Sequence, residues 1–201
     1  MAYWKRTHTT LAAILTAALT AALFTAPTHA KELAIWDQLQ GTNPKGYVLL
    51  MRHALAPGVG DPENFNVNDC STQRNLSEEG RQDARDIGQW LQRREVKILR
   101  VESSRWCRAK VTAQLLNIGK VRPNRNLDSL FQETNLESHP QTANIKKRIQ
   151  SHRNTRGLLV FVGHFVNFQA VAGVSLDSGE GVLIKATPSG EFKVMGYSPK
   201  P

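Results

Sequence analysis

The sequence predicts a three-layer α/β sandwich in which helices cover both faces of a mostly parallel central sheet. Two segments carry this prediction, 48–53 and 158–164, because each is a run of mainly branched apolar residues that ends in a histidine. Such runs are typical of strands that are buried on both faces of a parallel sheet. Helical patterns alternate with short strands between and after them, as they do in α/β domains.

The first thirty residues have the layout of a secretory signal peptide. Lys5 and Arg6 form a positive start, an apolar run covers 11–24, and Ala30 is a small residue at the expected cleavage position. A membrane anchor is the alternative, but the run is short and contains threonines, whereas a spanning helix needs about 20 apolar residues. We expect residues 1–30 to be removed on export to the periplasm or the medium. The mature chain, 31–201, should be a single domain without a membrane span.

A helix is expected after Ser77, which would cap it, with Glu78 and Glu79 in its first turn. Apolar residues then recur at helical spacing as far as Leu91. From residue 98 on, the expected elements are a strand over 98–101, helices over 106–117 and 143–154, a helix over 165–172 that stops at Gly173, and a hairpin of 181–186 and 191–197.

Three of the predicted strands are followed by residues suited to phosphate chemistry. Arg52 and His53 end the first strand, Arg108 follows the second, and His164 ends the third. Residues beyond the carboxyl ends of parallel strands meet at one edge of the sheet. Arginine binds phosphate bidentately, and neighbouring cations favour the neutral, nucleophilic form of histidine. We expect phosphoryl transfer to His53 and neither a metal nor another cofactor, because no carboxylates or cysteines cluster with the histidines.

The net charge of +9 suits an anionic partner. Basic residues are dispersed, without a run of five or more and without interleaved aromatic residues, and this disfavours a nucleic-acid binder. A small phosphorylated substrate is the partner that we expect.

The two cysteines, Cys70 and Cys107, form an even set in a chain expected to be exported, and this favours a disulfide. Two unpaired thiols are the alternative, since the sequence does not give the distance between their Cα atoms. Both lie close in sequence to residues of the predicted crevice, so we expect the bridge.

The chain resembles the histidine phosphatase (phosphoglycerate mutase-like) superfamily over residues 46–173. Four motifs in the family's order carry the resemblance: Arg-His-Ala at 52–54, Arg-Asn-Leu-Ser-Glu-Glu-Gly at 74–80, Ser-Ser at 103–104 with Arg-Ala at 108–109 and Thr-Ala at 112–113, and Gly-His at 163–164. Ala54 replaces the family's usual glycine, which is a mild departure. Phe165 stands where the acid-phosphatase branch has aspartate, so the chain resembles the smaller, branch-one type.

The resemblance implies a metal-independent phosphatase that works through a phosphohistidine on His53. Arg105 is then expected at the rim of the pocket rather than inside it. The catalytic candidates besides His53 are His164, Arg52, Arg108 and Glu133, and the candidates for phosphate binding are Arg52, Arg108, His164, Arg74 and Asn167.

The expected proton donor is the serious departure from the family. The family commonly has a Leu-x-Glu segment here, whereas residues 127–129 are Leu-Asp-Ser and place Ser129 at that position. Glu133 is our candidate, and the alternatives are Asp128, Asp61 and Glu63. A general acid contributes roughly 10²–10⁴-fold to the rate. Without one, the enzyme would favour phosphates with good leaving groups, such as phosphohistidine, pyrophosphates or sugar phosphates with stabilised alkoxides.

Two functions stay open at this point. One is an exported phosphatase, and the other is a low-turnover protein on the same fold that binds a phosphorylated ligand, which the missing acid favours. A mutase is disfavoured because it would act on cytoplasmic metabolites. A phosphorylated envelope sugar is a substrate suggested only by analogy with relatives that act on lipopolysaccharide cores. The insert 55–73 either covers the pocket and selects the substrate or is a plain surface loop.

Overall fold

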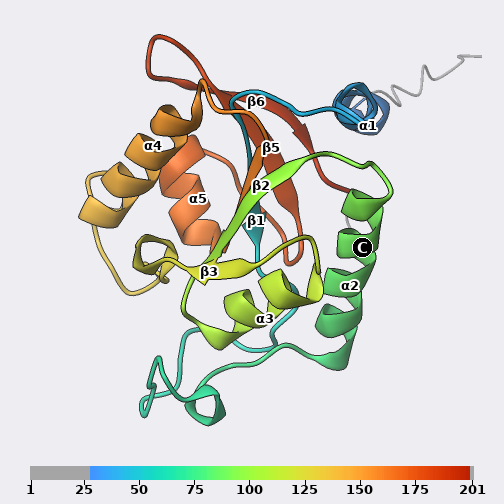
Figure 1. Ribbon diagram of the computed structural model, residues 1–201. Helices are drawn as coiled ribbons and strands as arrows, with labels where there is room; N and C mark the ends of the chain where they lie inside the picture. The colour runs from blue at the N-terminus through green and yellow to red at the C-terminus, as the bar shows by residue number, and fades with distance from the viewer. Residues whose placement is uncertain (1–27, 200–201) are drawn as a thin grey trace, which may run out of the picture.

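The structure, a computed structural model, describes residues 28–199 and is built around a six-stranded sheet (Figure 1). The strands lie in the order β3-β2-β4-β1-β5-β6. Their bounds are β1 Tyr47–Arg52, β2 Ile98–Ser103, β3 Val121–Pro123, β4 Leu158–Gly163, β5 Gly181–Ala186 and β6 Phe192–Tyr197. The first four strands in this order pair in parallel, whereas β5 is antiparallel to both of its neighbours. The mostly parallel sheet is therefore confirmed.

Helices pack on both faces of the sheet (Figure 1). On one face lie α1 (Thr28–Leu39), α2 (Glu78–Gln92) and α3 (Cys107–Leu115), and on the other lie α4 (Pro140–His152) and α5 (Phe165–Ala172). Alternate residues of β1 serve the two layers: Leu49 and Met51 pack under the first, and Val48 and Leu50 under the second. A strand buried on both faces needs an unbroken apolar run, and the predicted three-layer sandwich is confirmed.

Helix α2 begins where the sequence predicts. The Oγ atom of Ser77 accepts a hydrogen bond from the backbone N of Gly80 at 3.0 Å. Gly80 lies against the backbone of Leu55, and a Cβ atom at this position would come within 2.2 Å of the Leu55 carbonyl oxygen. A glycine is required here because α2 packs directly on the chain that leaves His53.

Several other helices and strands differ from those expected from the sequence. The sequence pattern does not indicate α1, β3 or the two short 3-10 helices, η1 (Cys70–Thr72) and η2 (Arg125–Leu127). Helix α4 begins at Pro140 rather than at residue 143, because His139 caps it and proline fits its first position. Helix α1 is tied to β6 by Trp36, whose Nε1 donates to the Tyr197 carbonyl at 2.8 Å.

The expected signal peptide lies outside the described residues except for 28–30, which begin α1. Among the helices of residues 28–199, none is long and apolar enough to cross a membrane.

Candidate active site

The pairing of β1 with β4 places His53 beside His164. Arg52 is in register with Gly163, and the backbone N of His53 donates to the Gly163 carbonyl at 2.9 Å. The two imidazole rings, both buried, have centroids 5.4 Å apart and meet edge to face. The sheet thus brings together the two histidines that were expected to share a crevice.

Hydrogen bonds fix the tautomer of His53. Its Nδ1 lies 2.8 Å from the carbonyl oxygen of Ala54, which can only accept, so Nδ1 carries the hydrogen. Its Nε2 is left with a lone pair and accepts from Nε of Arg108 at 3.3 Å. The pKa of His53 is lowered to about 3, mainly because burial disfavours the charged ring and also because arginines lie nearby. A neutral imidazole with a free Nε2 is what a nucleophile at this position requires.

Thr112 sets the position of Arg108. The Thr112 hydroxyl accepts from the backbone N of Ala54 at 3.0 Å and donates to the Arg108 carbonyl at 2.8 Å. The first turns of α3 are therefore fastened to the residue that follows His53. This contact turns the Arg108 side chain, 3 % exposed, toward the histidine.

Arg105 pairs with Asp128 and is not among the lining residues of the cavity. Its Nε donates to Oδ2 of Asp128 at 2.7 Å, and its backbone N donates to Oδ1 at 2.9 Å. The Arg105 side chain is 42 % exposed. The two arginines of this turn thus have separate carboxylate partners, since Arg108 pairs with Asp61 at 2.6 Å.

Arg52 and Arg74 complete an arginine cluster with Arg108. Nη1 of Arg52 donates to the Leu176 carbonyl at 3.0 Å, while its Nε is buried without a hydrogen-bond acceptor among the described residues. Arg74 donates to backbone carbonyls of residues 56, 57 and 60. The pKa values of Arg52 and Arg74 are lowered, first by burial and also by the charge of Arg108. Three neighbouring guanidinium groups, together with the Nε–H of Arg52 that has no acceptor, favour an anionic ligand.

These groups line one cavity of about 220 Å³. This volume is below the roughly 300–1,000 Å³ of sites for drug-sized ligands, so the cavity suits a small one. The lining residues are Arg52, His53, Gly58, Val59, Gly60, Arg74, Arg108, Ser129, Phe131, His164, Phe165 and Val166.

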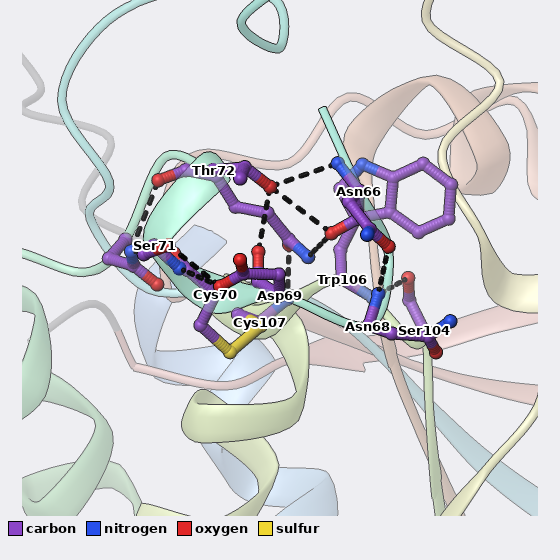
Figure 2. Close-up of a disulfide and its surroundings, with 11 residues drawn as sticks. Asn66, Asn68, Asp69, Cys70, Ser71, Thr72, Ser104, Trp106 and Cys107 are labelled. Carbon is purple, nitrogen blue, oxygen red and sulfur yellow. Dashed lines mark hydrogen bonds between the residues drawn. A yellow bond between two sulfur atoms is a disulfide. The ribbon is translucent and has the colours of Figure 1, made fainter. Parts of the chain in front are cut away.

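The pocket loop, residues 55–73, forms one wall of this cavity through residues 58–60. Cys70 and Cys107 are joined by a disulfide with Cα atoms 5.7 Å apart, so the predicted bridge is confirmed (Figure 2). Beside it, Oε1 of Gln73 accepts from the backbone N of Cys107 at 2.8 Å, and the ring of Phe65 stacks on Trp106. The loop is therefore part of the pocket and is fastened to the turn that carries Arg108.

Solved structures share this architecture, although no family model and no curated protein matches the chain. The protein histidine phosphatase SixA complexed with tungstate superposes with a TM-score of 0.58 at 17 % identity, over 76 % of this chain and 96 % of that one. For a phosphoserine phosphatase from Entamoeba histolytica, the TM-score is 0.56 at 11 % identity, over 76 % and 96 %. For a mycobacterial glucosyl-3-phosphoglycerate phosphatase, it is 0.54 at 15 % identity, over 77 % and 99 %. The chain has the histidine phosphatase fold.

This fold is what the four sequence motifs implied, and the resemblance is confirmed at that level. The histidine phosphatase fold places all four motifs around the cavity: Arg52 at the end of β1 and His53 directly after it, Arg74 before α2, Arg108 in α3 and His164 after β4.

Two expected site residues lie elsewhere in this histidine phosphatase fold. Glu133 is exposed and is not among the lining residues of the cavity. Asn167 is buried beneath the cavity wall: its Nδ2 donates to the Asp128 carbonyl at 2.8 Å, and its Oδ1 accepts from the backbone N of Leu130 at 3.3 Å. The Asn167 amide therefore holds the backbone on both sides of Ser129 rather than lining the pocket.

The other acids considered as proton donors are also engaged or distant. Asp128 accepts from Arg105, and Glu63 is exposed and outside the lining. Asp61 accepts from Nη1 of Arg108 at 2.6 Å and from Nε1 of Trp106 at 2.8 Å, so each of its oxygens is already an acceptor. Ser129, at the family's donor position, does line the cavity.

Ser104 is a site residue whose role the sequence analysis did not assign. Its Oγ lies 3.0 Å from Nε2 of His164 and 3.4 Å from Oδ1 of Asp128. The hydroxyl has one hydrogen, which goes either to Asp128 or to Nε2 of His164 according to the tautomer of that ring. When it goes to Nε2, the ring hydrogen of the neutral His164 is on Nδ1. The pKa of His164 lies well below its usual value, mainly because of burial and then because of His53 and the arginines. Its place in the Ser-Ser motif was the available signal.

Among residues 28–199, no three histidine, cysteine or acidic side chains are grouped so that they could hold a metal ion.

Proposed function

We propose that this protein is a metal-independent phosphatase that uses His53 as its nucleophile. One observation carries the proposal: a buried, neutral imidazole whose Nδ1 is bound to a carbonyl and whose Nε2 lies at Nε of Arg108. Arg52 and Arg74 line the same small cavity and add positive charge. Phosphoryl transfer needs little from a protein beyond positioning and such charge stabilisation.

The reaction has two steps. The lone pair on Nε2 of His53 forms a bond to phosphorus while the bond to the leaving oxygen breaks and leaves its electron pair on that oxygen. The oxygen of a water molecule then bonds to phosphorus while that water gives up a proton to the solvent, and the phosphorus–nitrogen bond returns its pair to Nε2. Arg52, Arg108 and His164 hold the phosphoryl oxygens during both steps, and the products are the dephosphorylated substrate and inorganic phosphate.

The leaving group receives little help from the protein. No carboxylate is among the cavity's lining in the described part of the chain, and Ser129 stands at the donor position. Serine is too weak an acid to replace glutamate as a proton donor. The proposed substrates are therefore small phosphates whose leaving group departs readily as an anion.

The lack of a carboxylate in the lining of the cavity also favours a second candidate, a protein that binds a phosphorylated ligand with little turnover. Both candidates use the arginine cluster in the same way. They differ in whether phosphate is released, so turnover decides between them.

The test is a panel of aryl, acyl and alkyl phosphates given to the purified exported protein, with and without a chelator. We expect phosphate release from the first two classes, unchanged by the chelator. Loss of activity with chelator and its recovery with a divalent cation would contradict the metal-independent mechanism. Phosphate binding without any release would favour the binding protein.

The nucleophile is tested by His53→Ala, with His139→Ala as the matched control. His139 caps α4, outside the lining of the cavity. We expect His53→Ala to abolish turnover and His139→Ala to keep it. A phosphoryl group trapped on the wild type should be labile to acid and stable to alkali, as phosphohistidine is. Activity above a few per cent in folded His53→Ala would remove His53 from this role.

We further propose that the protein is exported. The Cys70–Cys107 disulfide supports this, because such bridges persist in oxidising compartments. Mass spectrometry of the periplasmic protein should find an N-terminus at Lys31. A chain that keeps Lys5 and stays in the membrane fraction would show the uncleaved anchor instead.

A further inference from the structure

The walls of the cavity differ in chemistry. The lining combines the arginine cluster and the two histidines with an apolar wall formed by Val59, Phe131, Phe165 and Val166. Val59 is 85 % exposed and Phe131 is 44 % exposed. Only two other large hydrophobic side chains in the described part of the chain are exposed to this degree, Leu99 and Val194, and neither lines the cavity. Exposed apolar side chains gathered at a pocket mouth indicate a contact surface for a ligand.

The apolar wall is continuous with the arginine cluster. The guanidinium carbon of Arg52 lies 5.0 Å from the ring centroid of Phe165. The ring of Phe165 meets that of Phe131 edge to face, with centroids 6.4 Å apart. Across the mouth, Gly60 of the pocket loop faces Phe131, since a Cβ atom there would lie 4.0 Å from Cε1 of that ring. A ligand whose phosphate binds the arginines would therefore have Phe165 and Phe131 beside its remaining part.

This surface offers few hydrogen bonds to that remaining part. Apart from the two histidines, Ser129 is the one uncharged polar side chain among the described residues that line the cavity. A sugar has several hydroxyls, and each one buried without a hydrogen-bond partner weakens binding. An aromatic ring has no such requirement, and a well-placed aromatic neighbour stabilises it in addition to the apolar area that is buried.

The missing proton donor points to the same chemistry independently. Phenolic hydroxyls ionise with a pKa of about 10. Alkyl hydroxyls, like bulk water, ionise only at a far higher pKa. A phenolate can therefore leave without a proton from the enzyme, whereas an alkoxide cannot do so at a useful rate.

Accepting the phosphatase function proposed above, we propose that the substrate is a phosphate monoester of an aromatic hydroxyl, whose ring packs against Val59, Phe131 and Phe165. Nε2 of His53 bonds to phosphorus, the bond from phosphorus to the aryl oxygen breaks, and the electron pair leaves on that oxygen. The phenolate takes its proton from water after it departs. The aryl group supplies both the apolar contact and the easy departure.

The experiment compares two probes whose leaving groups need no proton donor, p-nitrophenyl phosphate and acetyl phosphate, of which only the first is aromatic. Wild-type protein should favour the aryl ester in kcat/KM by tenfold or more. Phe131→Ala should lower the ratio of the two kcat/KM values about tenfold, which corresponds to ~1.4 kcal/mol. Leu99→Ala removes an exposed apolar side chain on β2, outside the cavity lining, and should leave the ratio unchanged.

Equal wild-type kcat/KM values for the two probes, or a ratio that Phe131→Ala does not change, would overturn this inference while leaving the phosphatase function intact. If neither probe is hydrolysed, it is the phosphatase function that fails. Calorimetry then decides the aromatic preference, because phenylphosphonate should bind more tightly than methylphosphonate and equal binding would overturn the preference. Comparing kcat/KM for a phosphotyrosine peptide and for phenyl phosphate then shows whether the aromatic phosphate belongs to a protein side chain or to a small aryl ester.

Discussion

Replacing Arg108 by alanine removes two contacts that the structure assigns to one guanidinium. Its Nε lies 3.3 Å from Nε2 of His53, and its Nη1 lies 2.6 Å from Oδ1 of Asp61. In the reaction, the charge on the transferred group would develop next to this buried side chain. A preorganised donor at such a position contributes roughly 10²–10³-fold in rate, or about 2.7–4 kcal/mol. We expect kcat/KM of Arg108→Ala to fall by that amount.

The same substitution also costs stability, because the Asp61 carboxylate, 15 % exposed, loses its partner. Breaking a fully buried ion pair costs about 3–5 kcal/mol. Since Asp61 keeps its hydrogen bond to Trp106 and some contact with water, we expect the free energy of unfolding in urea to fall by about 2 kcal/mol. A double variant, Asp61→Ala with Arg108→Ala, should recover most of the stability and none of the activity. This separates the catalytic effect from the structural one.

Arg105→Ala is the matched control, since it removes the same side chain three residues earlier. Arg105 pairs with Asp128 outside the cavity, and because the Asp128 side chain is 7 % exposed, Arg105→Ala should cost stability by an amount similar to Arg108→Ala, about 2 kcal/mol. The assay is steady-state hydrolysis of p-nitrophenyl phosphate by variants shown to be folded by circular dichroism. Arg105→Ala should keep kcat/KM within about threefold of the wild type. Equal losses in the two variants, or a larger loss in Arg105→Ala, would refute the assignment of Arg108.

Three further predictions follow from the site. The folded His53 has a pKa of about 3 and the unfolded one about 6.5, so the unfolded chain binds the extra proton and stability should fall as the pH drops through this window. The free energy of unfolding, measured with urea at pH 6.5 and 4.5, should change less with pH in His53→Gln than in the wild type, by up to ~1.4 kcal/mol per pH unit. Equal changes in the two proteins would contradict the buried neutral ring. Native protein should show no alkylatable thiol, and reduction of the Cys70–Cys107 bridge should lower Tm, because closing its loop is worth about 4 kcal/mol in the chain-entropy model; two free thiols in native protein would refute the bridge. Ser129→Glu should raise kcat toward alkyl phosphates, by up to roughly 10²-fold, while Ser129→Gln, which has no proton to donate, should not; no gain from the glutamate would place the leaving oxygen elsewhere.

Much of the fold could be predicted from local patterns. The run that ends at His53 is apolar at every position because β1 is covered on both faces, and this requirement is visible in the sequence itself. The start of α2 was predicted because capping by Ser77 involves residues three apart. Helix α1 was missed, since it is held largely by Trp36 against a carbonyl 161 residues away.

The site divides in the same way. His53, His164 and Arg108 were predicted to lie close together because the carboxyl ends of parallel strands meet at one edge of the sheet, and this does not depend on the paths of the loops. Glu133 was expected near the reaction and is exposed, because its position depends on the path of the chain after η2. Asn167 was expected to bind phosphate, but its amide hydrogen-bonds the backbone around Ser129. The spacing of residues in the sequence predicts which helix a residue belongs to, but it does not predict which group its side chain will hydrogen-bond.

The sequence by itself determined the layered sheet, the edge at which the chemistry gathers and the identity of the two histidines, because these depend on alternation, burial and strand order. The tertiary structure decided that Asp61 pairs with Arg108 across 47 residues, that residues 58–60 close one wall, and that Phe131 faces the cavity. Those contacts depend on how two irregular loops cross the sheet edge. The path of a loop is set by contacts between distant residues, which leave no periodic pattern in the sequence.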